Sequence, residues 1–158
     1  MSFYIEIDGW KKGITFSSAH ILFGHDTCGF LHGHTYALSA RIAGEKSDND
    51  FVIDFKQVKK ILKEIANIFD HKILLPKKSK YIRIDTQKIT VQINKKQYVF
   101  PMEDCVLLPI TSITAENLAE YVIEEFLKKI KIPFTIKHIE VGVHEGYGQV
   151  AWKQKKVG

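Results

Sequence analysis

The spacing of apolar residues along the chain predicts strands toward both ends. Residues 3–7 and 13–23 are rich in Phe, Ile and Thr and are separated by an Asp–Gly turn signal, which predicts a first hairpin. Alternate positions over residues 32–42 are apolar or aromatic, the period of a strand. Residues 138–144 and 149–153 are predicted as two further strands, because a Gly-rich turn separates them.

Two segments instead have the period of amphipathic helices. The first begins at Asp54, where Gln57 three residues later resembles a capping box, and it ends near Phe69. The second begins at Thr114, a plausible N-cap, and ends before Pro133. Between these segments the chain returns to alternation, so the order of elements is strands, helix, strands, helix, strands.

The stretch between the helices, residues 81–100, predicts a small strand insertion with a hairpin loop at residues 94–96. The whole pattern predicts an α+β fold: an antiparallel four-stranded sheet with two helices on one face, plus the insertion. A length of 158 residues suits one compact domain, and the chain contains no repeat or linker. We therefore expect a single domain over residues 1–158.

Composition narrows the class of protein. The chain is 45% hydrophobic and 26% charged, as in ordinary globular proteins. No apolar run approaches the roughly 20 residues that cross a bilayer, and no leader pattern opens the chain, so we expect no membrane association and a cytoplasmic location. A net charge of +5 favours an anionic partner, but the lysines are scattered in short groups, which does not favour nucleic acid. The two cysteines, Cys28 and Cys105, are expected to be free thiols.

Three histidines are the main candidates for chemistry. His32 and His34 lie two positions apart on a predicted strand, so both imidazoles point to the same side. An antiparallel return through residues 21–31 can bring His20 opposite them. Three neutral imidazoles are a normal zinc set that leaves one position open for water or substrate. Taken alone, however, a His-x-His pair also fits two ordinary histidines on one strand face.

Other polar residues have two possible interpretations each. Cys28 lies four residues before His32, so its thiol is either a reactive group beside the metal or the fourth ligand of a closed structural site. Asp70 and His71 follow the first helix, where the carboxylate can fix the imidazole tautomer, although an exposed helix-end pair is common. Glu145, in a Gly-rich turn, is by itself unremarkable.

The segment Cys-Gly-Phe-Leu-His-Gly-His, residues 28–34, resembles the signature of the 6-pyruvoyl and 6-carboxy tetrahydropterin synthase family. Four further segments resemble the family in the same order along the chain. Residues 16–20 resemble its first zinc-ligand strand, Asp70-His71 its catalytic pair, residues 114–119 the start of its second helix, and residues 143–145 the strand end with its pterin anchor. The joint match is far more specific than any one motif.

The resemblance implies the tunnelling fold, in which subunits join edge to edge into a barrel, with sites at subunit boundaries. It therefore implies a homo-oligomer, a hexamer in this family. It also implies Zn²⁺ and the substrate 7,8-dihydroneopterin triphosphate. The site residues that it implies are the metal ligands His20, His32 and His34, the catalytic residues Cys28, Asp70 and His71, and the substrate-binding residues Glu145, Thr114 and Glu116.

In this chain three residues separate Cys28 from His32. The same spacing is typical of the carboxypterin branch of the family that the chain resembles. The resemblance to this branch implies a lyase activity, that of 6-carboxy-5,6,7,8-tetrahydropterin synthase, which releases acetaldehyde and triphosphate on the way to queuosine or archaeosine. The alternatives are the 6-pyruvoyl activity, an aldolase acting on dihydroneopterin, and a non-catalytic zinc-stabilised module such as an RNA-binding one. Two departures from the family are a long insertion at residues 77–110 and Ala115 in place of a hydroxyl residue.

Overall fold

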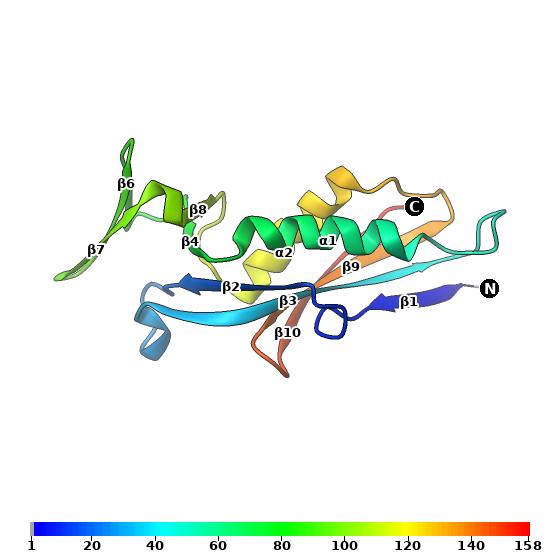
Figure 1. Ribbon diagram of the computed structural model, residues 1–158, viewed down its shortest axis with the longest axis horizontal. Helices are drawn as coiled ribbons and strands as arrows, with labels where there is room; N and C mark the ends of the chain where they lie inside the picture. Colours follow the sequence, from blue (N-terminus) through cyan, green and yellow to red (C-terminus); the bar gives the residue numbers. More distant parts are fainter. Residues whose placement is uncertain (1) are drawn as a thin grey trace.

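The computed structural model describes residues 2–158 and places two helices on one face of a long, twisted sheet (Figure 1). The two helices are α1 (Phe55–Phe69) and α2 (Ala115–Lys129). Six strands form the main sheet in the spatial order β10 (Val150–Lys156), β9 (Ile136–Glu145), β3 (His32–Gly44), β2 (Thr15–His20), β4 (Lys72–Pro76) and β8 (Cys105–Leu108). A seventh strand, β1 (Phe3–Ile7), pairs with β3.

The long strand β3 organises the sheet and corrects the predicted first hairpin. β1 and β2 do not pair with each other; each pairs antiparallel with β3, β2 along its first half and β1 along its second. The 13 residues of β3 are enough to hold both strands end to end. The linking loop is fastened to β3 midway, because Gly9 N–H donates to Ser39 Oγ at 2.9 Å and Leu38 N–H donates to the Ile14 carbonyl at 3.0 Å.

The sheet is also mixed, since β4 runs parallel to β2 and β8 runs parallel to β4. The predicted four antiparallel strands are present as β10, β9, β3 and β2, but β1, β4 and β8 extend the sheet to seven strands, and the α+β class with two helices on one face is confirmed. Strands β4 and β8 show no alternation because both of their faces are covered. In β4, Leu74 belongs to the main core and its neighbour Leu75 to a second core.

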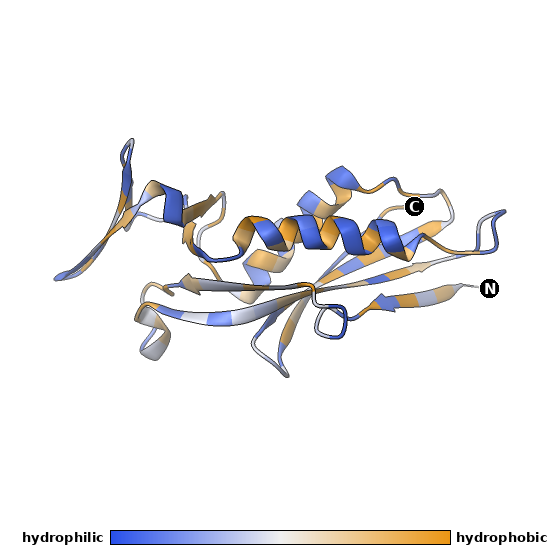
Figure 2. Cartoon of the chain, viewed as in Figure 1, coloured by the Kyte–Doolittle hydropathy of each residue, from blue (hydrophilic) through white to orange (hydrophobic). Residues whose placement is uncertain are grey.

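Both predicted helices are present, and each has the expected N-cap. The Asp54 carboxylate accepts from Lys56 N–H at 2.8 Å, one residue earlier than the predicted capping box requires, and Thr114 Oγ1 accepts from Asn117 N–H at 3.2 Å. Figure 2 shows the hydrophobic residues of α1 on the side facing the sheet. Burying each large apolar side chain there contributes about 1.5–3 kcal/mol, so packing on the sheet, rather than helix propensity, fixes both helices.

The insertion forms a sheet of its own, as predicted. Its strands are β5 (Ile82–Ile84), β6 (Lys88–Ile93) and β7 (Lys96–Pro101), and it stands at one end of the molecule (Figure 1). The turn between β6 and β7 uses Asn94 at φ 54°. A small separate core holds this sheet against β4 and the start of the β2–β3 loop, and its fully buried members are Ile21, Leu75, Ile89 and Val91.

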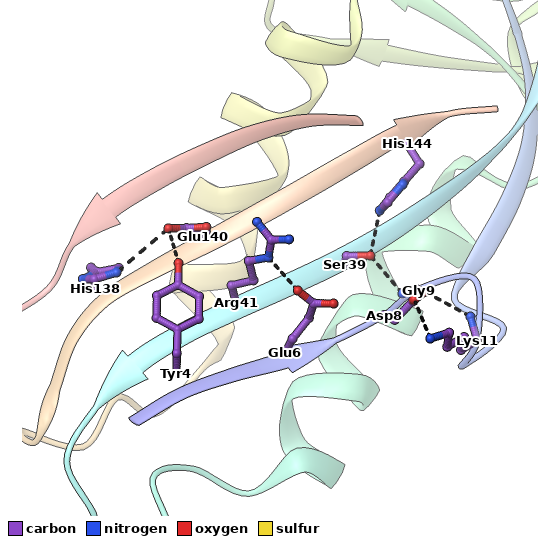
Figure 3. A network of polar contacts seen from close by, with 10 residues as sticks. All are labelled: Tyr4, Glu6, Asp8, Gly9, Lys11, Ser39, Arg41, His138, Glu140 and His144. Atoms are coloured by element: carbon purple, nitrogen blue, oxygen red, sulfur yellow. Dashed lines mark hydrogen bonds and ion pairs between the residues drawn. The ribbon is translucent and has the colours of Figure 1, made fainter. Parts of the chain in front are cut away.

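The sheet face opposite the helices is polar. Figure 3 shows side chains from three neighbouring strands linked across this face. Arg41 Nε donates to Glu6 Oε2 at 2.7 Å, and Tyr4 donates its hydroxyl to Glu140. The Arg41 guanidinium also lies 4.0 Å from the centre of the Trp152 ring. Both α-helices of residues 2–158 lie on the other face of the sheet (Figure 1). Within residues 2–158, none of the helices has the length and apolar character needed to cross a membrane.

Candidate metal and substrate site

Strand pairing brings the three predicted histidines together. His20, the last residue of β2, is directly opposite His32, the first residue of β3, and His34 follows two positions later on the same face. One ring nitrogen from each imidazole lies within 4.8 Å of the other two. His20 is fully buried, whereas His32 and His34 are partly exposed. The three side chains are thus positioned to hold one metal ion.

Backbone carbonyls determine which nitrogen of two of these rings carries the proton. His20 Nδ1 lies 2.8 Å from the Ile113 carbonyl, and His32 Nδ1 lies 2.7 Å from the Phe30 carbonyl. A carbonyl only accepts, so each Nδ1 is the donor and each Nε2 keeps its lone pair. The two Nε2 atoms face each other at 3.0 Å. Two lone pairs this close repel unless a cation lies between them.

The third imidazole supports the same conclusion. His34 Nε2 is buried and has no hydrogen-bond partner within the described residues, which is rare for a buried polar atom. The pKa of His20 is lowered to about 4, mainly by burial and to a smaller extent by the neighbouring His32 and His34, against the opposing effect of the Ile113 carbonyl. His20 is therefore neutral at pH 7, as a metal ligand must be. The donor set fits a divalent cation.

Cys28 lies beside this cluster in sequence but outside it in space. It belongs to the short 3₁₀ turn Thr27–Gly29, and its carbonyl accepts from Leu22 N–H at 2.9 Å. Among the described residues, the group of potential metal ligands contains the three histidines and not Cys28. Both cysteines are free thiols, as predicted. This arrangement does not correspond to the closed four-ligand site that was the alternative interpretation.

The three predicted substrate-binding residues line one cavity of about 280 Å³. Glu145 reaches it from the end of β9, where it pairs with Tyr36 of β3. Thr114 and Glu116 reach it from the start of α2. The Glu145 carboxylate lies 3.6 Å from His34 Nε2, so the cavity adjoins the histidine cluster. Burial raises the pKa of the Tyr36 hydroxyl, and the nearby Glu145 carboxylate raises it further.

The sequence analysis did not predict several other residues that form this site. The cavity is also lined by Leu22 and by Gln149, whose side-chain amide donates to the Glu145 carbonyl at 2.6 Å. The carbonyls that orient the imidazoles belong to Ile113 and Phe30. A backbone carbonyl is present at every position, so its role cannot be predicted from residue type.

The Asp70–His71 pair lies apart from the cavity. Asp70 Oδ2 is 2.9 Å from His71 Nδ1, and Asp70 Oδ1 accepts from Ser17 N–H at 2.8 Å. The Ser17 N–H, followed by His71, lowers the pKa of the Asp70 carboxyl. The His71 side chain is 84% exposed, and together with His34 it lines a separate hollow of about 490 Å³. Within this chain the pair is formed but is not part of the histidine cluster.

Comparison with known proteins gives consistent likenesses. A family model described as 6-pyruvoyl tetrahydropterin synthase matches residues 10–155. A Methanocaldococcus jannaschii protein, provisionally named 6-carboxy-5,6,7,8-tetrahydropterin synthase, is 44% identical over 156 residues, 96% of each chain. The Rickettsia felis protein of that name is 32% identical over 122 residues, 75% of this chain and 80% of that one.

Solved structures agree with these sequence matches. A catalytic-residue mutant of Plasmodium vivax 6-pyruvoyltetrahydropterin synthase matches 99% of each chain with a TM-score of 0.91 and 25% identity. The Plasmodium falciparum 6-pyruvoyl tetrahydropterin synthase matches 99% of each chain with a TM-score of 0.89 and 26% identity.

Proposed function

The chain belongs to the 6-pyruvoyl tetrahydropterin synthase family, and from this premise we propose that it is a zinc-dependent 6-carboxy-5,6,7,8-tetrahydropterin synthase. The reaction consumes 7,8-dihydroneopterin triphosphate and one water and yields 6-carboxytetrahydropterin, acetaldehyde and triphosphate. One observation carries the proposal: the Glu145 carboxylate lies 3.6 Å from an imidazole of the three-histidine cluster. A pterin held by Glu145 then presents its side chain to the metal.

His20, His32 and His34 would hold the zinc ion. Their nitrogens lie within 4.8 Å of one another, and three imidazoles are a catalytic zinc set because one position stays open. When bound, the ion supplies Lewis acidity, which makes C–H and O–H protons beside the substrate oxygens easier to remove. The carbonyls of Ile113 and Phe30 keep two of these rings in the ligating tautomer.

Glu145 would anchor the pterin. An ionised carboxylate accepts hydrogen bonds from the amino and ring N–H groups of a pterin, and these bonds are charge-assisted. Thr114 and Glu116 line the same cavity and would add further contacts. A cavity of about 280 Å³ suits the flat bicyclic ring and not the entire substrate with its triphosphate.

Cys28 and the Asp70–His71 pair would move protons. The Cys28 thiolate would act as base, and His71, oriented by Asp70 at 2.9 Å, would return the proton on the opposite side. The 84% exposure of His71 supports a site completed at a subunit boundary, where His71 of one chain serves the cavity of its neighbour. The proposal thus includes a homo-oligomer acting in the cytoplasm, with a product destined for queuosine or archaeosine synthesis.

The test is to incubate zinc-loaded protein with dihydroneopterin triphosphate and to identify the pterin product by mass. We expect 6-carboxytetrahydropterin with stoichiometric acetaldehyde. A 6-pyruvoyl product would select the sister activity, which the names of the Plasmodium neighbours favour. Unchanged substrate would overturn the enzymatic proposal and leave a non-catalytic binding module.

A further inference from the structure

Most of the net positive charge of this protein lies in the insertion. Residues 77–104 contain seven lysine and arginine residues against three acidic ones, a formal charge of +4, whereas the rest of the chain has sixteen basic against fifteen acidic residues. The insertion sheet and the β2–β3 loop lie at the same end of the molecule (Figure 1). A concentrated field of this kind attracts an anion toward one place on the surface.

A hollow of about 600 Å³ lies where the insertion meets the Cys28 loop. One wall is the β6–β7 turn with Lys95 and Lys96, and the other is the loop on both sides of Cys28, including His25 and Phe30. The Lys96 ammonium lies 3.9 Å from the centre of the Phe30 ring, so it spans the gap between the walls. In the described chain, neither lysine forms an ion pair with a carboxylate.

This hollow is connected to the histidine cluster through the chain, because a single residue separates Phe30, which lines the hollow, from His32. Phe30 places its ring under Lys96 and its carbonyl on His32 Nδ1 at 2.7 Å. The same loop contributes Leu22 to the pterin cavity and Phe30 to the second hollow, so one loop lines both. The two hollows are thus neighbouring places along one loop where the ring and the tail of a single substrate can bind.

The chemistry of the proposed substrate requires such a division. The triphosphate is on the third side-chain carbon, next to the two hydroxyl-bearing carbons that the metal would activate on the proposed function. The pterin cavity contains two carboxylates, Glu116 and Glu145, and repels a polyanion. The hollow beside Cys28 instead has two unpaired ammonium groups and the His25 imidazole against one carboxylate, Asp26. Lysine ammonium groups are ordinary phosphate ligands.

We propose that this hollow is the triphosphate subsite, with Lys95 and Lys96 as the side chains that bind the phosphate oxygens. The inference rests on the proposed function and extends it, because it gives the insertion a role in recognising the phosphorylated substrate. It also predicts that the protein distinguishes dihydroneopterin triphosphate from dihydroneopterin by this hairpin.

The test measures binding by calorimetry in zinc-loaded protein carrying Cys28→Ala, which prevents turnover. In this background, Lys95→Ala/Lys96→Ala should weaken binding of dihydroneopterin triphosphate by about tenfold or more, the effect of losing charge-assisted hydrogen bonds. Binding of unphosphorylated dihydroneopterin should not change. Lys77→Ala/Lys78→Ala is the matched control, since it removes the same charge from the insertion outside the hollow, and it should leave both affinities unchanged.

Three outcomes would overturn the inference. One is an unchanged affinity for the triphosphate in the Lys95/Lys96 variant. Another is an equal loss of affinity for the triphosphate in Lys77→Ala/Lys78→Ala, which would indicate only a general electrostatic attraction to the insertion. The third is a selective loss in Lys72→Ala, which would assign the tail to the hollow lined by His34 and His71. Binding of neither pterin by the parent protein would instead contradict the proposed function itself.

Discussion

For individual side chains, the account depends on the division of labour between three imidazoles and one thiol. His20, His32 and His34 each bring one ring nitrogen to the same place, whereas Cys28 lies outside the group. A cysteine that is not a ligand can, once ionised to the thiolate, act as the proposed base. The proposal of a catalytic rather than a structural metal site therefore depends on the position of Cys28 on a short turn beside the cluster and not within it.

Cys28→Ala should therefore abolish turnover without removing the metal. We expect product formation to fall by roughly 10²–10⁴-fold, the usual contribution of a general base. Zinc per chain, measured by elemental analysis, and the melting temperature should stay as in the parent protein. A variant that loses its zinc and unfolds would identify the thiol as a ligand instead.

Much of this constellation could be predicted from residues alone, and the reason is geometric. A His-x-His pair on a strand must share one face, and a preceding antiparallel strand can supply the third ring. The supporting carbonyls of Ile113 and Phe30 could not be predicted, because any residue type can provide them. The 84% exposure of His71 was equally inaccessible to sequence, since it depends on where the turn after α1 points.

The sequence predicts which segments form strands and helices better than it predicts which strands pair with each other. The Asp8–Gly9 turn signal predicts a hairpin, yet β1 and β2 both pair with β3. Local turn chemistry was outweighed by the length of β3 and by the contacts of the linking loop. Strands β4 and β8 were not predicted at all, because a short apolar run without alternation does not distinguish a buried strand from another buried segment.

The loop contact can be tested with Gly9→Ala. A Cβ at this position would lie 2.2 Å from the Leu38 carbonyl oxygen, a backbone atom that cannot move without shifting β3. We expect a loss of about 2–3 kcal/mol in the free energy of unfolding, measured by urea titration. Gly13→Ala is the control: at φ +62° with nothing within 4 Å, it should lose only about 1 kcal/mol. Equal effects would contradict the close approach.

The junction between α1 and β2 makes a pH-dependent contribution through Asp70. Its carboxylate accepts from Ser17 N–H at 2.8 Å, and this bond, with His71, lowers its pKa below the ordinary value of 3.8. The unfolded chain therefore binds the proton more readily. The resulting stabilisation is fully present well above pH 4 and is lost as the pH falls through the lowered pKa of the folded state.

Asp70→Asn should accordingly reduce the free energy of unfolding at pH 7 by about 1 kcal/mol or less, because the side chain is 37% exposed and water screens the charge. The difference from the parent protein should shrink as the pH falls below about 4. Denaturant titrations between pH 3 and pH 7, at one protein concentration, measure this difference. A stability difference between the parent protein and Asp70→Asn that increases at low pH would contradict a lowered pKa of Asp70 in the folded state.

For the chain as a whole, the fold leaves sheet edges available for association. β10 and β8 are the outermost strands of the main sheet, and exposed strand edges favour pairing with other chains. The polar face opposite the helices carries the Arg41–Glu6 and Tyr4–Glu140 contacts (Figure 3), which suit a hydrated surface better than a buried layer.

Light scattering on the purified protein should therefore give a mass that is a multiple of 18.2 kDa, with six chains as the number that the family leads us to expect. On the proposed function, association would bring the exposed His71 of one chain to the substrate of its neighbour. A stable species of 18.2 kDa that is fully active would contradict a site shared between subunits.

The measurement that tests the metal centre most directly is X-ray absorption at the zinc edge of the purified protein. Three histidine ligands predict nitrogen scatterers at about 2.0–2.1 Å, with a light oxygen atom completing the shell and imidazole outer-shell features. The Cys28→Ala spectrum should be the same. A sulfur scatterer at about 2.3 Å that disappears in Cys28→Ala would show a closed site and contradict the catalytic account.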